Sequence, residues 1–210
     1  MEQDQVKLVQ IDSQTSETAE IGQKLMALCA AASQDSLPMA KNISDINWQK
    51  RPETLLYCLF LEKRFDKENG CLYGLILNDI LIAVSGIYRS DFNPEHIAVG
   101  GVRTYTREEY RNRFWHGEYL IPGQIEWAKK NGLSQVIFSF NEESSPLRRF
   151  LLRAKSGKAT ALGLEPPSIY KNLIEHPRPI LLKNKLQQIL KLNLRPGFEW
   201  DYTKLEHGEG

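Results

Sequence analysis

The sequence has few cysteines, no long apolar run and almost no net charge. Its three cysteines, Cys29, Cys58 and Cys71, are too few and too widely spaced for a disulfide framework or a zinc site. Its longest apolar runs, such as LLYCLFL, fall short of the roughly 20 residues that a membrane-spanning helix needs. The formal net charge of +1 provides no global field that would attract nucleic acid or a membrane surface. We therefore expect no metal site, no specific nucleic-acid partner and no membrane contact.

The remaining composition is that of a globular protein that can build a sizeable core. Hydrophobic residues make up 41% of the 210 residues and charged residues 25%, which is ordinary for a folded domain. No internal repeat or low-complexity linker divides the chain, so we predict a single domain over residues 1–205 and a disordered tail over residues 206–210. The first residues are polar and carry no hydrophobic signal segment. The expected setting is the reducing cytoplasm.

The first third of the chain predicts one strand followed by two helices. Alternating apolar residues predict a strand over residues 6–12. Residues 16–33 place apolar side chains on one helical face behind hydroxyl residues that can cap the helix. Residues 52–65 begin with Pro and Glu, which favour a first helical turn. We predict a helix there, although the apolar run LLYCLFL is also compatible with a buried strand.

From Cys71 onward the apolar pattern has a period of two, which predicts three consecutive antiparallel strands. Strands over residues 71–77 and 80–90 are joined by Asn-Asp, two residues that tolerate the positive φ of a tight hairpin turn. A further turn, DFNPEH, leads to a third strand over residues 97–106.

A helix with an internal proline is predicted after the third of these strands. It runs from about Trp115 to Lys130 and contains Pro122, which lacks an amide hydrogen and predicts a kink. Alternatively, the regular helix begins at Pro122 and a longer loop precedes it.

Two more helix and strand patterns close the chain. A buried strand over residues 133–140 precedes a short helix over residues 145–155, with Ser145 as its cap. Paired strands are predicted over residues 179–184 and 186–194. The order is therefore β-α-α-βββ-α-β-α-ββ. It predicts an α+β fold in three layers, with a mixed, mostly antiparallel central sheet of about seven strands flanked by helices.

This order, together with the segment GGVRTYTREEYRNRFWHGEYLIPGQIEWAKKNG, resembles the GNAT superfamily of CoA-dependent acyltransferases. In that family the fourth strand ends beside a loop of the form Arg/Gln-x-x-Gly-x-Gly/Ala, and the loop and the helix after it hold the CoA pyrophosphate. The physical reason holds independently of the family. A helix N-terminus presents unpaired N–H groups and about half a positive charge, so an anion is bound favourably there.

The resemblance implies a pyrophosphate-binding loop that has lost its glycines. Tyr110 and Arg111 stand where the family has its Tyr-Arg pair. Counted from Arg111, the two glycine positions hold Phe114 and His116; one residue further along they hold Trp115 and Gly117. Bulky side chains at such positions either point away from a ligand or block it. Phe114 and Trp115 are also compatible with ordinary core packing.

The resemblance also implies which residues would bind the donor. The backbone of the third of the three consecutive antiparallel strands would bond the pantetheine arm, and the loop would bind the pyrophosphate. An asparagine that ends the next strand would lie near the CoA arm. These positions correspond here to Val102, Arg103, Thr104, Arg111, Asn112, Arg113, Phe114, Trp115, His116, Gly117 and Asn141.

The position of the family's frequent general acid, a tyrosine, is occupied here by Phe150, which has no proton to donate. We therefore predict Tyr170 and Glu142 as the catalytic candidates, the first as acid and the second as a base acting through water. Glu143, Glu95 and His96 are further candidates.

The function that follows from the resemblance is transfer of an acetyl group from acetyl-CoA to an amine of a small molecule or peptide. The alternative is a catalytically inactive binding or structural module that keeps the GNAT fold, which the missing glycines and Phe150 favour. Transfer of another acyl group, such as an aminoacyl or fatty chain, also stays open. A homodimer formed through the last strands is compatible with the sequence.

Overall fold

The computed structural model describes residues 5–11, 65, 68–110, 115–140, 145–157, 167–182 and 185–205. The two helices predicted between residues 16 and 65 and the predicted tail lie outside these residues, apart from the single position Phe65.

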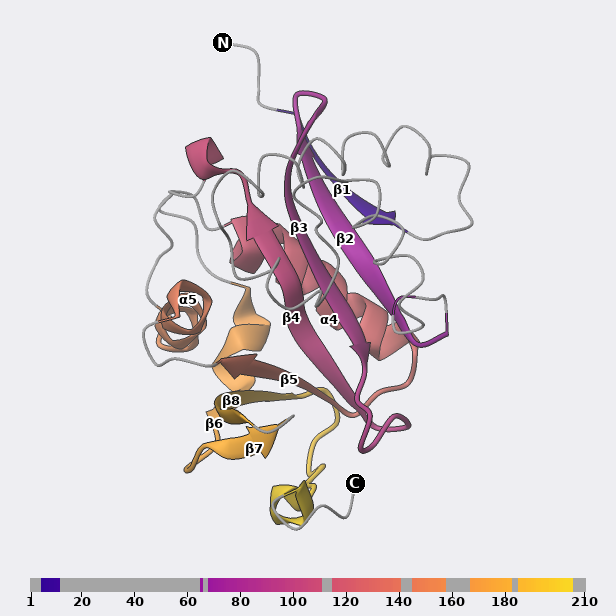
Figure 1. The fold of residues 1–210 in the computed structure, drawn as a ribbon, viewed down its shortest axis with the longest axis vertical. Helices are drawn as coiled ribbons and strands as arrows, with labels where there is room; N and C mark the ends of the chain where they lie inside the picture. The colour runs from indigo at the N-terminus through magenta and orange to yellow at the C-terminus, as the bar shows by residue number, and fades with distance from the viewer. Residues whose placement is uncertain are drawn as a thin grey trace.

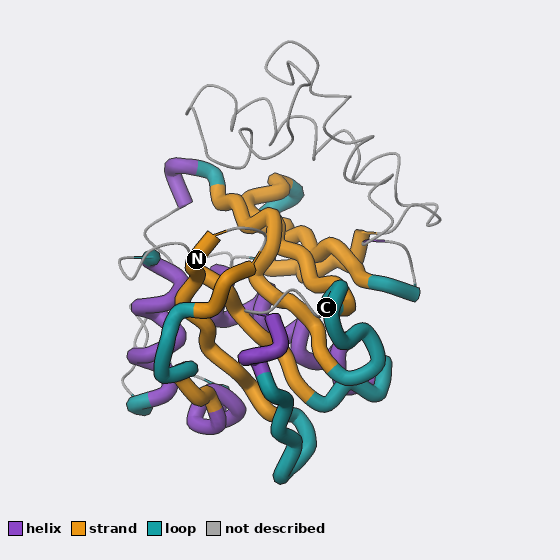
Figure 2. Tube along the Cα trace, turned by 60° about the horizontal axis from the view of Figure 1, so that its bottom comes forward, coloured by secondary structure: helices purple, strands orange, loops and turns teal. Residues whose placement is uncertain are grey.

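One mixed sheet organises the fold (Figure 1). Figure 2 shows its strands as a single twisted layer with the larger helical segments beneath it. Among the described residues, six of the seven strand pairings are antiparallel and only β4 with β5 is parallel, so the predicted mixed, mostly antiparallel sheet is confirmed. In spatial order the strands are β1 (Val6–Ile11), β2 (Gly70–Leu77), β3 (Ile80–Arg89), β4 (Ile97–Thr106), β5 (Gln135–Phe140), β8 (Lys185–Asn193) and β6 (Leu173–Glu175), with β7 (Ile180–Leu182) also paired to β8.

The helical segments and the C-terminal segment bury the two faces of the sheet in separate clusters. The larger cluster joins α4 (Ile121–Lys130) and α5 (Pro146–Lys155) to side chains from β2, β3 and β5. A smaller cluster places Tyr202 and neighbouring C-terminal residues against Ile97, Ile137 and Ile189. The shorter segments are η3 (Glu108–Tyr110), η4 (His116–Leu120), η5 (Ser168–Asn172) and η6 (Tyr202–Leu205).

The hairpin between β2 and β3 has the turn that the sequence predicts. Asn78 and Asp79 both have positive φ, 46° and 64°. A two-residue turn of this hand matches the right-handed twist of the strands that it joins. The prediction is confirmed.

The end of the sheet differs from the predicted pair of strands. β6 and β7 both pair with β8, β6 with residues 190–192 and β7 with residues 185–187. The chain between them contains Pro177 and Pro179, which cannot donate to a strand ladder, and only the His176 N–H bonds to β8, at the Ile189 carbonyl (2.9 Å). The prediction of two strands here missed β6, because its three residues are too few to show a period.

The predicted helix from Trp115 to Lys130 is continuous, and its irregular part lies just before Pro122. Residues 116–120 form a π-helical turn, in which the Ile121 N–H reaches back five residues to the His116 carbonyl. The next bond of that pattern would join the Pro122 nitrogen to the Gly117 carbonyl, but proline has no hydrogen to donate. The Tyr170 hydroxyl donates to the Gly117 carbonyl instead (2.5 Å).

Gly117 is also the point where α5 contacts this helix. A Cβ added at Gly117 would lie 1.7 Å from Cε1 of Phe150, so the Phe150 ring rests directly on the helix backbone. Phe150 in turn meets the Tyr170 ring edge to face, with centroids 6.2 Å apart. One missing side chain therefore allows η4, α5 and η5 to close on one another.

We expect Gly117→Ala to lower the free energy of unfolding by about 1–3 kcal/mol, because the added methyl group overpacks against the Phe150 ring. The matched control is Gly123→Ala in the same helix. There a Cβ meets the flexible end of Leu8 at 2.8 Å and lies in ordinary contact with the Tyr73 ring at 3.4 Å, so a neutral change or a gain of up to about 1 kcal/mol from helix propensity is expected. Urea denaturation measures both. Equal effects of the two substitutions would contradict the close packing of Phe150 on Gly117.

Candidate active site

The parallel ladder between β4 and β5 stops partway along both strands. Ile97 to Gly100 pair with Gln135 to Phe138, and no later residue of β4 pairs with the described residues of β5. β5 nevertheless continues to pair with β8 up to Phe140. The two strands therefore diverge from Gly101 onward, as the ribbon shows (Figure 1). The backbone of residues 102–105 is left without a partner strand on this side among the described residues.

A bulge at Gly101 causes the divergence. In the pairing with β3, Val102 faces Gly86 and Gly100 faces Ile87, so Gly101 is an extra residue in β4. Its φ of 68° lies in the left-handed region, which glycine adopts without steric cost. An inserted residue of this kind bends the strand and interrupts pairing. The tandem glycines of the sequence therefore mark the point where β4 leaves β5.

The bulge is tied to α4 by a buried glutamine. Gln124 is fully buried, and its Oε1 accepts a hydrogen bond from the Gly101 N–H (2.9 Å). Sequence analysis missed this residue. The available signal was a polar side chain within the apolar stripe formed by Ile121, Ile125 and Ala128, all of which are buried.

Apolar side chains from the two helices lie beside the bulge. A Cβ added at Gly101 would lie 3.2 Å from Leu147, 3.5 Å from Phe138 and 3.9 Å from Ile121. Leu147 belongs to the first turn of α5, so this helix begins next to the divergence. Ser145 occupies the cap position of α5 as predicted, but its side chain makes no capping hydrogen bond.

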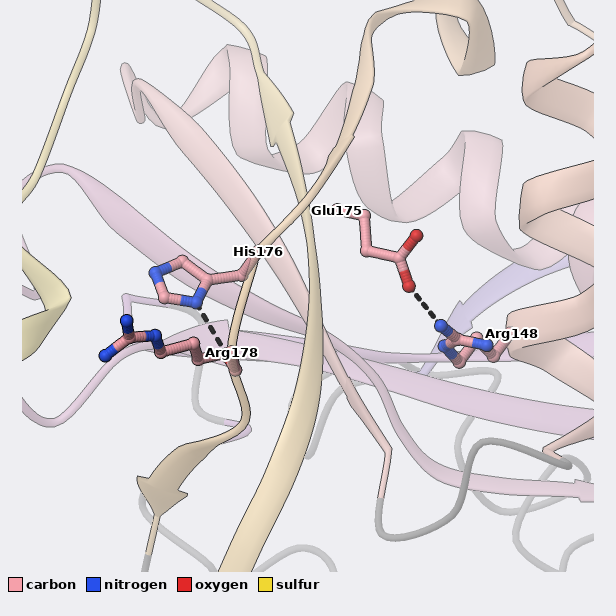
Figure 3. Close-up of polar contacts among 4 residues, drawn as sticks. All are labelled: Arg148, Glu175, His176 and Arg178. Carbon is pink, nitrogen blue, oxygen red and sulfur yellow. Dashed lines mark hydrogen bonds and ion pairs between the residues drawn. The ribbon is translucent and has the colours of Figure 1, made fainter.

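An ion pair fixes α5 against the edge of the sheet on the far side of β8. Arg148 of α5 pairs with Glu175 of β6 (Figure 3). In the same view, Nδ1 of His176 bonds to the Arg178 carbonyl (2.8 Å), which orders the bend between β6 and β7. The ion pair therefore links α5 to β6, one of the last strands.

Near the start of the helix, the Trp115 ring is packed in the core, and His116 and Glu118 have buried side-chain atoms without a hydrogen bond. The Trp115 ring is 2% exposed, packs in the main core and donates from Nε1 to the Tyr110 carbonyl (3.1 Å). His116 Nε2 lies 2.5 Å from Thr106 Oγ1 at the end of β4, while its Nδ1 is buried without a hydrogen bond. Both carboxylate oxygens of Glu118 are likewise buried without a hydrogen bond.

The predicted acid Tyr170 is fully buried beneath this helix start. Its hydroxyl is engaged with the Gly117 carbonyl. Burial, and to a lesser degree the charge of Glu118, raises the pKa of Tyr170 well above its ordinary value. The phenol therefore keeps its proton at physiological pH.

The described structure places only part of the predicted site. Val102, Arg103 and Thr104 lie on β4 just beyond the bulge, and Trp115, His116 and Gly117 lie at the start of the described part of the helix. Glu95 and His96 are exposed at the start of β4, the opposite end from the divergence, so they are not brought to it. The predicted residues Arg111, Asn112, Arg113, Phe114, Asn141, Glu142 and Glu143 lie outside the described residues.

Within the part of the chain that the structure describes, no helix has both the length and the apolar character needed to cross a membrane. The same residues contain no group of three or more His, Cys, Asp or Glu side chains arranged to hold a metal ion.

Comparison with known proteins gives matches in structure but not in sequence. No protein-family model matches the sequence, and no curated protein matches it either.

Solved structures match over nearly the whole chain. A candidate acetyltransferase of the GNAT family from Desulfovibrio desulfuricans aligns with 91% of this chain and 100% of its own, at 9% identity and a TM-score of 0.55. The PaiA N-acetyltransferase from Thermoplasma acidophilum, solved with coenzyme A, aligns with 90% of this chain and 99% of its own, at 12% identity and a TM-score of 0.51.

A third match is FeeM, an N-acyl amino acid synthase from uncultured soil microbes, which aligns with 91% of this chain and 92% of its own at 8% identity and a TM-score of 0.50. At such identities the likeness establishes the fold alone. The sheet order, the parallel β4–β5 pair and these matches agree, and the chain therefore has the fold of the GNAT-family acetyltransferases.

Proposed function

We propose that this chain is a CoA-dependent N-acyltransferase that moves an acetyl group from acetyl-CoA to an amine of a small molecule or peptide. The observation that carries the proposal is the divergence of β4 from β5 at Gly101, which leaves main-chain groups of β4 without a strand partner. Unpaired main-chain groups need another partner, and the amides of a pantetheine arm are suited to that role. The acetyltransferase matches support it.

The donor would be held at two places, the edge of β4 and the start of the helix that continues into α4. Main-chain groups of Val102, Arg103 and Thr104 would bond the pantetheine arm, beside the apolar side chains of Leu147 and Phe138. Acetyl-CoA supplies a thioester whose carbonyl carbon accepts the amine.

The pyrophosphate would lie at the start of the helix, with Arg111, Asn112 and Arg113 supplying charge and hydrogen bonds. N–H groups at a helix start can bind an anion without needing a glycine-lined loop. The Trp115 ring is packed in the core and is therefore not turned into the proposed phosphate site, which supports the proposal.

In the reaction, the amine nitrogen bonds to the thioester carbonyl carbon and gives up a proton, the carbon–sulfur bond breaks, and the leaving thiolate takes up a proton. We propose that catalysis rests mainly on positioning the amine and on main-chain N–H groups that stabilise the developing oxyanion. This scheme tolerates Phe150 at the family's acid position. Asn141 beside the donor and Glu142 acting as base through water remain part of the proposal.

The acyl group is the finer part of the proposal. FeeM shares the fold and is an N-acyl amino acid synthase, so the fold accommodates proteins described by other acyl products. We favour acetyl because the other matches used here are described as acetyltransferases.

Calorimetric titration tests donor binding directly. We expect binding of CoA and acetyl-CoA, and Arg111→Ala should weaken it about tenfold through loss of a charged hydrogen bond. Lys130→Ala is the matched control, because it removes the same charge from the exposed far end of the helix. No binding heat up to about 1 mM CoA would overturn the proposal and favour a GNAT-fold binding module.

Tyr170→Phe separates a catalytic hydroxyl from a structural one. Loss of the bond to Gly117 should lower the free energy of unfolding by about 1–3 kcal/mol in either case. If Tyr170 donates the proton, kcat should also fall about 100-fold with KM for acetyl-CoA unchanged. An unchanged kcat in steady-state assays would assign Tyr170 to support of the helix only.

His116 predicts a pH dependence of stability. Burial lowers its pKa from 6.5 to about 4, so the folded protein holds a neutral imidazole that adds no positive charge to the proposed phosphate seat. Because the unfolded chain binds the proton more readily, this residue lowers stability as the pH falls from 6.5 toward 4. In urea denaturation at pH 7 and 4.5, His116→Gln should lose about 2 kcal/mol less than the unsubstituted protein. Identical losses would show that the imidazole protonates freely in the folded state.

A further inference from the structure

We infer that Gln124 is a positioning residue that holds the bulge of β4 in its open form, and so sets the main-chain edge on which the donor of the proposed acyltransferase would lie. This inference rests on the proposed function for its ligand. The bulge lock itself rests on the geometry alone.

Both main-chain groups of Gly101 are taken up by side chains on the α4 face of the sheet. The Gly101 N–H donates to Gln124 Oε1 (2.9 Å), and the Gly101 carbonyl accepts from Thr104 Oγ1 (2.8 Å). Each of these groups would otherwise be free to seek a partner on the neighbouring strand β5. The side chains therefore keep β4 from continuing its parallel ladder.

The two side chains are joined through Ser85 into a closed ring. Gln124 Nε2 donates to Ser85 Oγ (2.8 Å), and Ser85 Oγ lies 2.8 Å from Thr104 Oγ1. Since the Thr104 hydroxyl hydrogen is already used on Gly101, Ser85 must donate to Thr104. Every hydrogen in the ring then points the same way round, and each bond strengthens the next.

These hydrogen bonds fix the orientation of the Gln124 side-chain amide. Its oxygen must face the Gly101 N–H, which can only donate, and its nitrogen must then face Ser85. Gly100 makes the approach possible, because a Cβ there would lie 3.1 Å from Gln124 Oε1 and 2.8 Å from the Phe138 ring. Gly101 thus allows the strand to bend, and Gly100 leaves room for the Gln124 amide.

Gln124 is fully buried and acts through the backbone rather than on the ligand. It sits on α4, which continues the helix whose first turn is the proposed pyrophosphate seat. The ring therefore couples that seat to residues 102–104 of β4, so that both ends of a bound donor are held by one rigid unit.

The test compares Gln124→Leu with Gln135→Leu. Gln135 is a second buried glutamine, on β5, whose amide bonds to Asn193 and accepts from Tyr202 at the closed end of the β4–β5 pair. Both substitutions remove two hydrogen bonds from a buried amide, so both should destabilise the protein. Only Gln124→Leu should weaken CoA binding, by about tenfold in calorimetry, and speed hydrogen exchange of the Gly101 amide measured by NMR.

Gln124→Glu provides the conservative rescue in its protonated form, which burial favours, since one carboxyl oxygen can accept from Gly101 and the O–H can donate to Ser85. It should restore the protection of the Gly101 amide and most of the CoA affinity. If Gln124→Leu does not fold, Ser85→Ala opens the same ring at a milder point and should raise the Gly101 exchange rate and the Kd for CoA in the same direction.

The outcomes separate the two proposals. CoA binding by the unsubstituted protein that Gln124→Leu, or Ser85→Ala in its place, leaves unchanged would overturn the inference. If the unsubstituted protein binds no CoA, the proposed function fails, and with it the donor-binding role of Gln124. Exchange at Gly101 then decides the bulge lock alone. Faster exchange in Gln124→Leu but not in Gln135→Leu supports it, and equal exchange overturns it.

Discussion

The structure depends on how the main-chain groups of a single residue, Gly101, are satisfied. A buried N–H or carbonyl without a partner costs about as much as a lost hydrogen bond, so a strand cannot leave its neighbour without compensation. Here a glutamine from the covering helix and a threonine from the same strand provide that compensation. The divergence of β4 from β5 is therefore built into the packing of α4 on the sheet.

The helix start follows the same rule on a different carbonyl. Pro122 leaves the Gly117 carbonyl without its helical donor, and the Tyr170 hydroxyl replaces it from 53 residues further along the chain. Because Gly117 lacks a side chain, Phe150 can lie on the same turn. A glycine that the family resemblance assigns to phosphate approach thus has a packing role that is independent of any phosphate. Its presence at this position is explained even if no ligand binds there.

Periodic patterns allowed the meander and its turn to be predicted, whereas the features that shape the site could not be. β4 was predicted at Ile97 to Thr106 because ten residues give a clear apolar pattern, and the Asn78–Asp79 turn followed from local backbone preference. β6 has three residues and shows no period. The ring around Gln124 joins three elements, and the Tyr170 bond joins two. Such contacts depend on tertiary packing, which one chain's pattern does not contain.

The missing glycines of the loop are weaker evidence against phosphate binding when contacts outside the loop position the helix. In a glycine-lined loop, close backbone approach supplies most of the contact with a phosphate. Here the strand edge is fixed by the Gln124 ring and the helix axis by Gly117, Phe150 and Tyr170. The direction of the first helical N–H groups is then set by the core rather than by the loop. A loop of larger residues needs only to leave those N–H groups accessible, a weaker demand on sequence than the glycine motif makes. A chain can therefore keep the architecture of an acetyltransferase while its most recognisable motif is lost.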